Sequence, residues 1–308
     1  MKISNDTRVY VAGCGGMLGD AVYARLKTTG ATIKATDIDC NEPWLGYADV
    51  RDYAAIRIDI AAFKPNLIIN LAALTDLEFC ETEQENSWLT NALGAENLGL
   101  IAMQLDVPYV YISTAGIVDG ERDVYNDFQM PNPLSVYAQS KYYGEQYLRN
   151  SVTKHFVIRA GWMMGGGPRK DKKFINKIYK QIRAGATELF VVDDKLGTPT
   201  YTVDFANGLC TIVESEQYGL YNQVCNGAAS RFDVAREFLR LLDLTDKIKL
   251  TVVSSDHFKA QYHAPRPASE KLVNLKLNHR GLNRMRDWDV CLSEYAEAFK
   301  ADLRKNLA

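Results

Sequence analysis

Residues 8–26 constrain the fold of this chain more than any other segment. Four strand-forming residues, Arg8 to Val11, are followed by glycines at positions 13, 15, 16 and 19, and then by residues whose apolar members share one helical face. This order of strand, glycine turn and helix is typical of the first βαβ unit of a dinucleotide-binding domain. The glycines allow a tight turn and a close approach of a pyrophosphate, to which the helix start offers unpaired N–H groups.

The glycine spacing alone leaves an alternative open. The pattern Gly13-x-x-Gly16-x-x-Gly19 differs from the older G-x-G-x-x-G form, and it also suits a glycine-rich turn before an ordinary helix. Asp37 favours the nucleotide site because it ends a second strand, 24 residues (37 − 13) after Gly13, where an acidic residue meets the adenosine ribose hydroxyls. Asp39 competes for this role. No arginine directly follows Asp37, which favours NAD(H) but leaves NADP(H) open.

Strand and helix patterns alternate through the first half of the chain. The expected elements after the glycine loop are strand 32–36, helix 53–63, strand 67–72, helix 87–105, strand 109–112, helix 136–150 and strand 156–159. A further short strand is expected to end at Asp49 and Val50, near the adenine. Such alternation predicts an α/β fold, a doubly wound parallel sheet with right-handed crossovers.

The rhythm changes after the glycines at 165–167. We expect residues 1–164 to form the dinucleotide-binding domain, with part of 198–227 returning to it, and residues 165–308 to form mostly a smaller substrate-binding lobe. A basic cluster, Arg169, Lys170, Lys172 and Lys173, lies at the junction. It is either a solvated loop or a site for an anionic ligand.

Composition narrows the class of protein. The chain has 308 residues and a net charge of −2, which gives no electrostatic reason to bind nucleic acid or an anionic membrane. No apolar run approaches the length of a membrane span, and no signal segment is visible. The six cysteines form no C-x-x-C pair and the four histidines do not cluster. We therefore expect a cytoplasmic protein with reduced thiols and no metal.

A pair of side chains on the expected helix 136–150 carries the candidate chemistry. Tyr137 and Lys141 lie four residues apart and so share one face. A cation beside a phenol is expected to lower the pKa of the phenol, which would then act as a general acid. Thr114, at the carboxyl end of a strand, is placed to hydrogen-bond a substrate carbonyl. The alternatives are an amphipathic helix with a solvated lysine, since the chain has 17 tyrosines, and a threonine that caps a turn.

With these residues, the chain resembles the extended short-chain dehydrogenase/reductases, and within them the dTDP-4-dehydrorhamnose reductase family. The resemblance runs through most of the chain. The segments that carry it are the glycine loop 13–19, the strand region 65–76, the residues Tyr137-Ala138-Gln139-Ser140-Lys141 with Gly144-Glu145, the strand end Arg159-Ala160-Gly161-Trp162, the segment 191–200 and Arg266-Pro267.

The resemblance implies a reaction and a set of site residues. Thr114, Tyr137 and Lys141 would be the catalytic triad in the NAD(P)H-dependent reduction of the C-4 ketone of a nucleoside-diphosphate 6-deoxy-4-keto-hexose, as in dTDP-L-rhamnose synthesis. Besides Tyr137 and Lys141, the residues implied to bind NAD(H) or NADP(H) are Gly13, Gly16, Met17, Leu18, Gly19, Asp37, Asp49, Val50, Leu71, Ala72 and Ala73. Those implied to bind the sugar nucleotide are Thr75, Thr114, Trp162, Lys173 and Arg266.

Two departures from the family pattern leave the substrate open. Ala115 and Gly116 stand where the family has an aspartate and then an aromatic residue, and the Lys172-Lys173-Phe174 stretch replaces a more neutral segment. The alternatives are an NAD-dependent sugar-nucleotide epimerase or dehydratase, and a non-catalytic nucleotide-binding regulatory subunit. The sugar, the product stereochemistry and the choice between NAD and NADP stay undetermined. Because the family often dimerises, the resemblance allows a homodimer.

Overall fold

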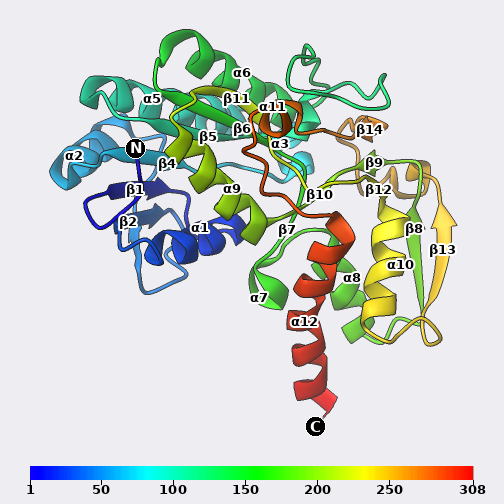
Figure 1. Cartoon of the computed structure of the whole chain (residues 1–308). Coiled ribbons are helices and arrows are strands. Elements are labelled where there is room, and N and C mark those ends of the chain that lie inside the picture. Colours follow the sequence, from blue (N-terminus) through cyan, green and yellow to red (C-terminus); the bar gives the residue numbers. More distant parts are fainter. Residues whose placement is uncertain (308) are drawn as a thin grey trace.

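A seven-stranded sheet forms the centre of the computed structural model, which describes the backbone of residues 1–307 and the side chains of residues 1–305. Its strand order is β11-β6-β5-β4-β1-β2-β3, and all neighbours run parallel. The strands are β1 (Arg8–Ala12), β2 (Thr32–Asp37), β3 (Leu45–Tyr47), β4 (Leu67–Asn70), β5 (Tyr109–Thr114), β6 (His155–Ala160) and β11 (Gly219–Asn222). Figure 1 shows helices on both faces, so the predicted doubly wound, Rossmann-like α/β fold is confirmed.

Both faces of the sheet are buried. In β1, Val9 and Val11 pack into the hydrophobic core on one face, whereas Tyr10 and Ala12 pack into a second core on the other. Successive strand residues point to opposite faces, so a strand covered on both sides must be apolar throughout. The first core lies under α1 (Met17–Lys27) and α9 (Thr202–Ser215), and the second lies under α2 (Tyr53–Phe63), α5 (Gly94–Leu105) and α6 (Val136–Ser151).

Two predicted elements differ from those observed. The stretch expected as one helix over 87–105 consists of α4 (Gln84–Trp88), a π-helical turn η1 (Leu89–Leu93) and α5, preceded by the short α3 (Leu77–Thr82). The π-helical turn carries Asn91, whose side chain hydrogen-bonds the backbone of Leu74 beyond the carboxyl end of β4. The third strand, β3, ends at Tyr47, so Asp49 and Val50 lie beyond it in the loop that leads to Asp52, the N-cap of α2.

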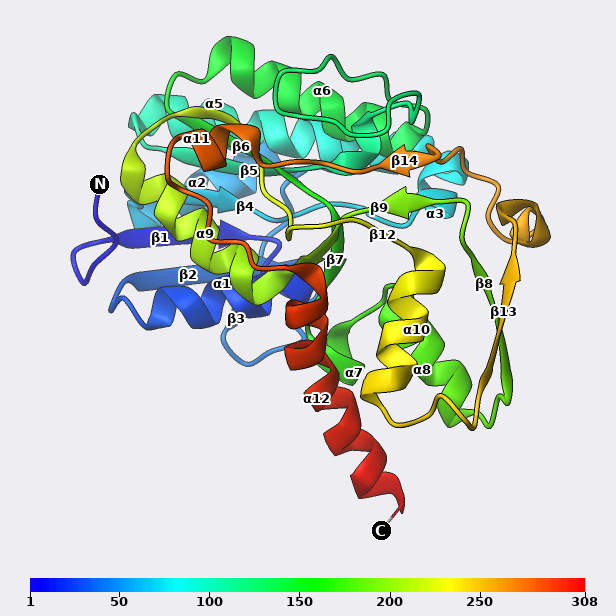
Figure 2. The ribbon, with the colours of Figure 1, turned by 45° about the vertical axis from the view of Figure 1, so that its right-hand side comes forward.

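A smaller lobe lies beside the sheet, to the right in Figure 2. It contains the parallel pair β8 (Glu188–Val192) and β13 (Lys249–Val253), packed on α8 (Phe174–Arg183) and α10 (Arg231–Leu241). Three two-residue strands, β12 (Ala229–Ser230), β9 (Leu196–Gly197) and β14 (Ser269–Glu270), form a small sheet, and β7 (Trp162–Met164) pairs with β10 (Pro199–Tyr201). These small sheets lie at the junction with the central sheet.

The remaining elements connect the two regions. They are α7 (Gly167–Lys170), the 3-10 turns η2 (Ala115–Ile117) and η3 (Ser255–Phe258), α11 (Leu275–His279) and the C-terminal α12 (Trp288–Leu307). Strand β11 joins the central sheet although it follows the lobe's first elements in the chain. Among the described residues, no helix has both the length and the apolar character that crossing a bilayer requires.

Candidate active site

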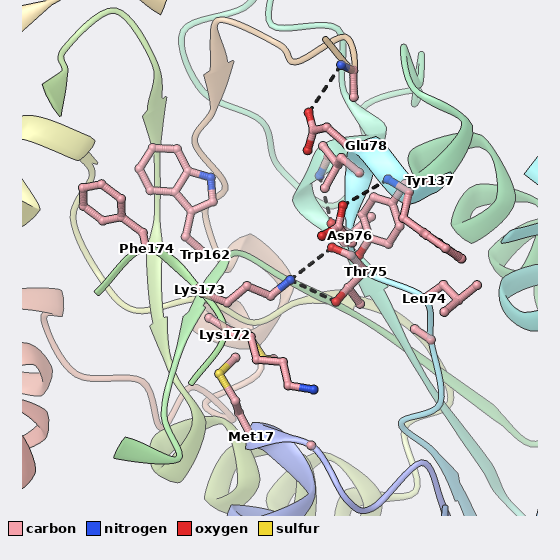
Figure 3. Close-up of a pocket in the computed structure, with 18 of the residues that line it drawn as sticks. Met17, Leu74, Thr75, Asp76, Glu78, Tyr137, Trp162, Lys172, Lys173 and Phe174 are labelled. Atoms are coloured by element: carbon pink, nitrogen blue, oxygen red, sulfur yellow. Dashed lines mark hydrogen bonds between the residues drawn. The ribbon is translucent and has the colours of Figure 1, made fainter. Parts of the chain in front are cut away.

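A cleft of 1810 Å³ lies between the carboxyl ends of the central strands and the smaller lobe. Ligands of open α/β sheets bind at this edge. Every residue that the sequence analysis assigned to cofactor, substrate or catalysis lines this one cleft. Figure 3 shows Met17 at one end, Tyr137 on the side of the sheet, and Trp162 and Phe174 on the side of the lobe.

The glycine loop closes the cleft at the end of β1. Gly13 has φ +73°, and a Cβ there would lie 2.2 Å from the backbone nitrogen of Ala72 after β4. A Cβ on Gly19 would lie 2.0 Å from the Cys14 carbonyl oxygen. Side chains at these positions would push the loop away from the sheet and the helix away from its strand. Gly16 is the N-cap of α1 and offers no side-chain cap, so the first N–H groups of this helix are available to a phosphate.

Asp37 is hydrogen-bonded to the glycine loop, and both are predicted to bind the dinucleotide. One of its carboxylate oxygens accepts a hydrogen bond from the Gly15 N–H at 2.8 Å, and the other accepts one from the Asp39 N–H at 3.0 Å. Asp39 itself is exposed. At the adenine end of the cleft expected from the sequence, the guanidinium of Arg51 donates to both carboxylate oxygens of Asp49 and holds the pKa of that carboxyl below its usual range.

The segment after β4 is fixed by a residue that the sequence analysis did not assign. The Asn91 side chain accepts a hydrogen bond from the Leu74 N–H at 2.9 Å and donates one to the Leu74 carbonyl at 3.0 Å. Both backbone groups of Leu74 are thereby satisfied without a strand partner. The signal in the sequence was only an asparagine within the stretch expected as helix 87–105, and the structure shows that this asparagine is fully buried. Asn91 therefore positions the segment that leads to Thr75.

Tyr137 lies in the first turn of α6. Ser135 caps that helix by accepting a hydrogen bond from the Ala138 N–H at 3.2 Å. Burial raises the pKa of the Tyr137 phenol to about 12, although a hydrogen bond with the Thr114 hydroxyl opposes the rise. The expected lowering of this pKa by the lysine is therefore wrong, because desolvation of the phenolate is the largest contribution to the shift.

Lys141 is buried one turn further along α6. Its ammonium lies 4.0 Å from the centre of the Tyr111 ring and forms no hydrogen bond or ion pair with a described residue. Burial lowers the pKa of Lys141 to about 7, and the carboxylate of Glu145 opposes this. The carboxylate of Glu145 forms an ion pair with Arg159, so its negative charge is shared between Arg159 and Lys141. The amine is thus left free for a ligand in the cleft.

The predicted substrate residues bind partners within the protein. The Lys173 ammonium donates to the Thr75 hydroxyl at 2.9 Å and to the Thr75 carbonyl at 3.1 Å, as Figure 3 shows. The Arg266 guanidinium binds both carboxylate oxygens of Glu78, at 2.8 and 2.9 Å. Both contacts connect the smaller lobe to the segment 75–78 across the cleft. The Trp162 indole N–H donates to Glu270.

The basic cluster at the junction divides into two parts. Lys170 forms ion pairs with Asp20 and Glu42, and Arg169 also pairs with Glu42, so their charges are matched by carboxylates of the nucleotide-binding side. All four basic residues line the cleft, and Figure 3 shows Lys172 and Lys173 in it. No group of three or more His, Cys, Asp or Glu side chains in the described part of the chain is arranged to hold a metal ion.

Comparison with known proteins gives the family. The model of the RmlD substrate binding domain family matches residues 7–301. A dTDP-4-dehydrorhamnose reductase of Mycolicibacterium smegmatis is 30% identical over 296 residues, which cover 94% of this chain and 85% of that protein. The spore coat polysaccharide biosynthesis protein SpsK of Bacillus subtilis is 29% identical over 292 residues, which cover 94% and 97%.

Solved structures agree. The crystal structure of dTDP-4-dehydrorhamnose reductase from Yersinia enterocolitica has a TM-score of 0.85 and 32% identity, and the match covers 96% of this chain and 100% of that one. A dTDP-4-dehydrorhamnose reductase from Bacillus anthracis in complex with NADP has the same TM-score of 0.85 at 26% identity, covering 96% and 99%. The predicted resemblance is confirmed: the chain belongs to the RmlD substrate binding domain family, together with proteins named dTDP-4-dehydrorhamnose reductase.

Proposed function

We propose that this protein is an NAD(P)H-dependent reductase of the C-4 ketone of a nucleoside-diphosphate 6-deoxy-4-keto-hexose, as in dTDP-L-rhamnose synthesis. The observation that carries the proposal is that Thr114, Tyr137 and Lys141 line the same cleft as the glycine loop. A proton donor and a dinucleotide cradle thus share one space. The family's named reductases support the choice of substrate class.

The residues would divide the work as follows. A bound nicotinamide cofactor supplies the hydride for the ketone carbon. Tyr137 gives its phenolic proton to the developing alkoxide, and a pKa of about 12 keeps that proton in place at neutral pH until the oxyanion forms. Thr114 donates a hydrogen bond to the same oxygen. Lys141 holds the nicotinamide ribose and, when charged, stabilises the tyrosinate that proton transfer leaves.

Cofactor binding would use the two ends of the first βαβ unit. The free N–H groups at the start of α1 meet the pyrophosphate, and Asp37 accepts hydrogen bonds from the adenosine ribose hydroxyls. A carboxylate at this position repels a 2′-phosphate. We therefore propose that both NADH and NADPH serve, with NADH bound more tightly.

The diphosphate of the substrate would meet Lys173 and Arg266. Both side chains reach the cleft from the lobe, and both are bound to groups of segment 75–78. A diphosphate offers the same kind of charge-assisted acceptor. We propose that the diphosphate takes the place of Glu78 on Arg266.

We also propose a cytoplasmic location and a homodimer for the working enzyme.

The test is NADH oxidation, followed as loss of absorbance, with dTDP-4-dehydrorhamnose generated in situ and NADPH run in parallel. The proposal predicts turnover with both cofactors and one reduced sugar nucleotide per cofactor consumed. The epimerase or dehydratase alternative predicts instead that NAD copurifies with the protein and that sugar is converted without net NADH loss. A regulatory subunit would bind the dinucleotide and convert no sugar nucleotide at all.

A further inference from the structure

Glu270 and Arg231, two charged side chains that the sequence analysis did not assign, surround Trp162 on the lobe side of the cleft. Glu270 lies on β14 and Arg231 is the first residue of α10, and both line the cleft. Trp162 joins them, because its indole N–H donates to Glu270 and its ring lies under the Arg231 guanidinium, 3.6 Å from the ring centre. The three side chains therefore form one unit opposite Tyr137.

Glu270 presents one carboxylate oxygen to the reacting end of the cleft. Its Oε2 accepts the indole N–H, whereas Oε1 accepts no hydrogen bond from a described residue. A Cβ built on Gly116 would lie 3.2 Å from this Oε1 and 3.5 Å from the Thr114 hydroxyl oxygen. The free oxygen is thus a near neighbour of Thr114. The charge of Glu270 also contributes to the raised pKa of Tyr137, which places it close to the catalytic phenol.

Arg231 brings hydrogen-bond donors that the protein does not use. Its guanidinium is stacked between the rings of Trp162 and Phe174 and makes no hydrogen bond or ion pair within the described part of the chain. An arginine carries five N–H donors, which stacking on aromatic rings leaves free at the edge. Trp162 cannot retreat, because the backbone of Gly197 lies so close to it that a Cβ there would overlap the indole. The donors are held in a fixed place.

We propose that Glu270 and Arg231 are specificity-determining residues for the sugar, with Glu270 Oε1 accepting a hydrogen bond from the C-3 hydroxyl and Arg231 donating to a further sugar oxygen. The proposal rests on the proposed function, in which Thr114 meets the oxygen on C-4. Of the two carbons next to C-4 in such a sugar, C-3 carries the hydroxyl. The preferred substrate therefore keeps its C-3 hydroxyl.

The opposite charges favour a neutral, hydroxylated sugar over charged ones. A sugar ammonium would bind Glu270 but lie near Arg231, and a sugar carboxylate would bind Arg231 but lie near Glu270. Each carries an unfavourable like-charge contact in a poorly solvated place. Hydroxyl groups both donate and accept, so they satisfy both residues without such a contact.

Gly116 is part of this arrangement. An aromatic side chain at position 116, the residue type expected there from the family, would begin at a Cβ only 3.2 Å from the Glu270 carboxylate. The glycine thus leaves the space that the carboxylate needs. The departure noted in the sequence at Gly116 is explained as room for a polar contact with the sugar.

Binding measurements test the proposal without requiring turnover. The dissociation constants of dTDP and dTDP-L-rhamnose are measured by calorimetry for the wild type, Glu270→Gln, Glu270→Ala and the control Glu237→Gln, which lies on α10 outside the cleft. The dissociation constant of dTDP divided by that of dTDP-L-rhamnose measures how much the sugar adds to the affinity. Because hydrogen bonds to charged groups are worth about 1.5–3 kcal/mol, Glu270→Ala should reduce this ratio about 10- to 150-fold. Glu270→Gln, which keeps an acceptor, should reduce it less.

The same variants distinguish a specific contact from a structural one. Affinity for dTDP alone and for NADH should stay within about twofold of the wild type, because neither ligand contacts the sugar subsite. A dTDP-sugar that lacks the C-3 hydroxyl should bind the wild type more weakly than dTDP-L-rhamnose does. The Glu270→Ala variant should bind these two ligands with equal affinity. The proposal is overturned if the ratio is unchanged in Glu270→Ala, or if dTDP alone weakens as much as the sugar nucleotide.

A second pair of variants tests the space at Gly116. Gly116→Phe should reduce the sugar contribution in the wild-type background, since the ring displaces the carboxylate, and should have little further effect in Glu270→Ala. Equal losses in both backgrounds would contradict the arrangement. If these binding results hold while no keto-sugar is reduced, the sugar subsite stands and the reductase function fails. If a keto-sugar is reduced but the ratio of dissociation constants is unchanged in Glu270→Ala, the reductase function stands and the sugar subsite fails.

Discussion

The pKa values of Tyr137 and Lys141 are shifted in opposite directions, away from each other. Burial raises the pKa of the phenol to about 12 and lowers that of the lysine to about 7. In both cases the charged form loses its hydration. A phenol that stays protonated suits the proposed direction of reaction, in which it must give a proton only after the hydride has arrived.

The pH dependence of cofactor binding follows from Lys141. Its folded pKa is depressed, so the ammonium is present below about 7 and is lost as the pH rises through that value. If the ammonium holds the nicotinamide ribose, the dissociation constant of NADH should rise between about pH 6 and about pH 9. Fluorescence titration across this range measures it. In Lys141→Met the dependence should disappear; an unchanged profile in that variant would assign the titration to another group.

Asp37 gives a prediction about cofactor choice. In Asp37→Ala, the affinity for NADH should fall about tenfold or more, since a charge-assisted hydrogen bond to the ribose is lost, while NADPH should be affected less. Direct binding of the two cofactors to both proteins measures this. Asp39→Ala changes the exposed competing carboxylate and should reduce the affinity for NADH less than Asp37→Ala does. Equal losses for NADH and NADPH would remove Asp37 from the ribose site.

At the scale of elements, the π-helical turn η1 fixes the segment after β4. Replacing Asn91, whose side chain is fully buried, by alanine leaves the half-buried N–H and carbonyl of Leu74 without these partners. We expect a loss of about 1–3 kcal/mol in the free energy of unfolding, measured by urea denaturation. Asn207→Ala, at an exposed position on α9, should change it by less than about 0.5 kcal/mol. Similar losses in both variants would exclude the positioning role.

The contact between Arg266 and Glu78 couples the lobe to α3. If a substrate diphosphate replaces Glu78 on this guanidinium, Arg266→Ala should raise the KM for the sugar nucleotide about tenfold or more and change kcat less. Steady-state kinetics measure both. Arg236→Ala, which removes an exposed ion pair of α10 outside the cleft, is the control. An unchanged KM in Arg266→Ala would take this arginine out of the substrate subsite.

At the scale of the whole molecule, the sheet was predictable and the lobe was not. Alternating apolar strands and helices are local patterns, so β1, β4 and β5 could be placed from sequence. The lobe is built from strands as short as β9, and from contacts between distant residues, such as Arg266 with Glu78, 188 residues apart. Neither leaves a periodic signal. We still propose the division into residues 1–164, with part of 198–227, and a lobe mostly of 165–308.

The residues of the candidate site also fall into those that the sequence predicted and those that it did not. Gly13, Tyr137 and Trp162 lie in recognisable motifs, and the cleft contains all of them. Glu270 and Arg231 were missed because charged residues on short strands or at helix starts are common, and only the fold places them beside Trp162. Burial likewise decided the pKa of Tyr137, which sequence spacing could not reveal.

The central claim is that Tyr137 donates the proton in reduction of a sugar-nucleotide ketone within this cleft. Its most direct test compares the wild type with Tyr137→Phe for NADH oxidation by dTDP-4-dehydrorhamnose and for NADH affinity. The account predicts that turnover falls by about 10²- to 10⁴-fold, as when a general acid is lost, while NADH affinity stays within about twofold. Turnover that survives in Tyr137→Phe, or NADH binding that is lost although the variant folds, would contradict it.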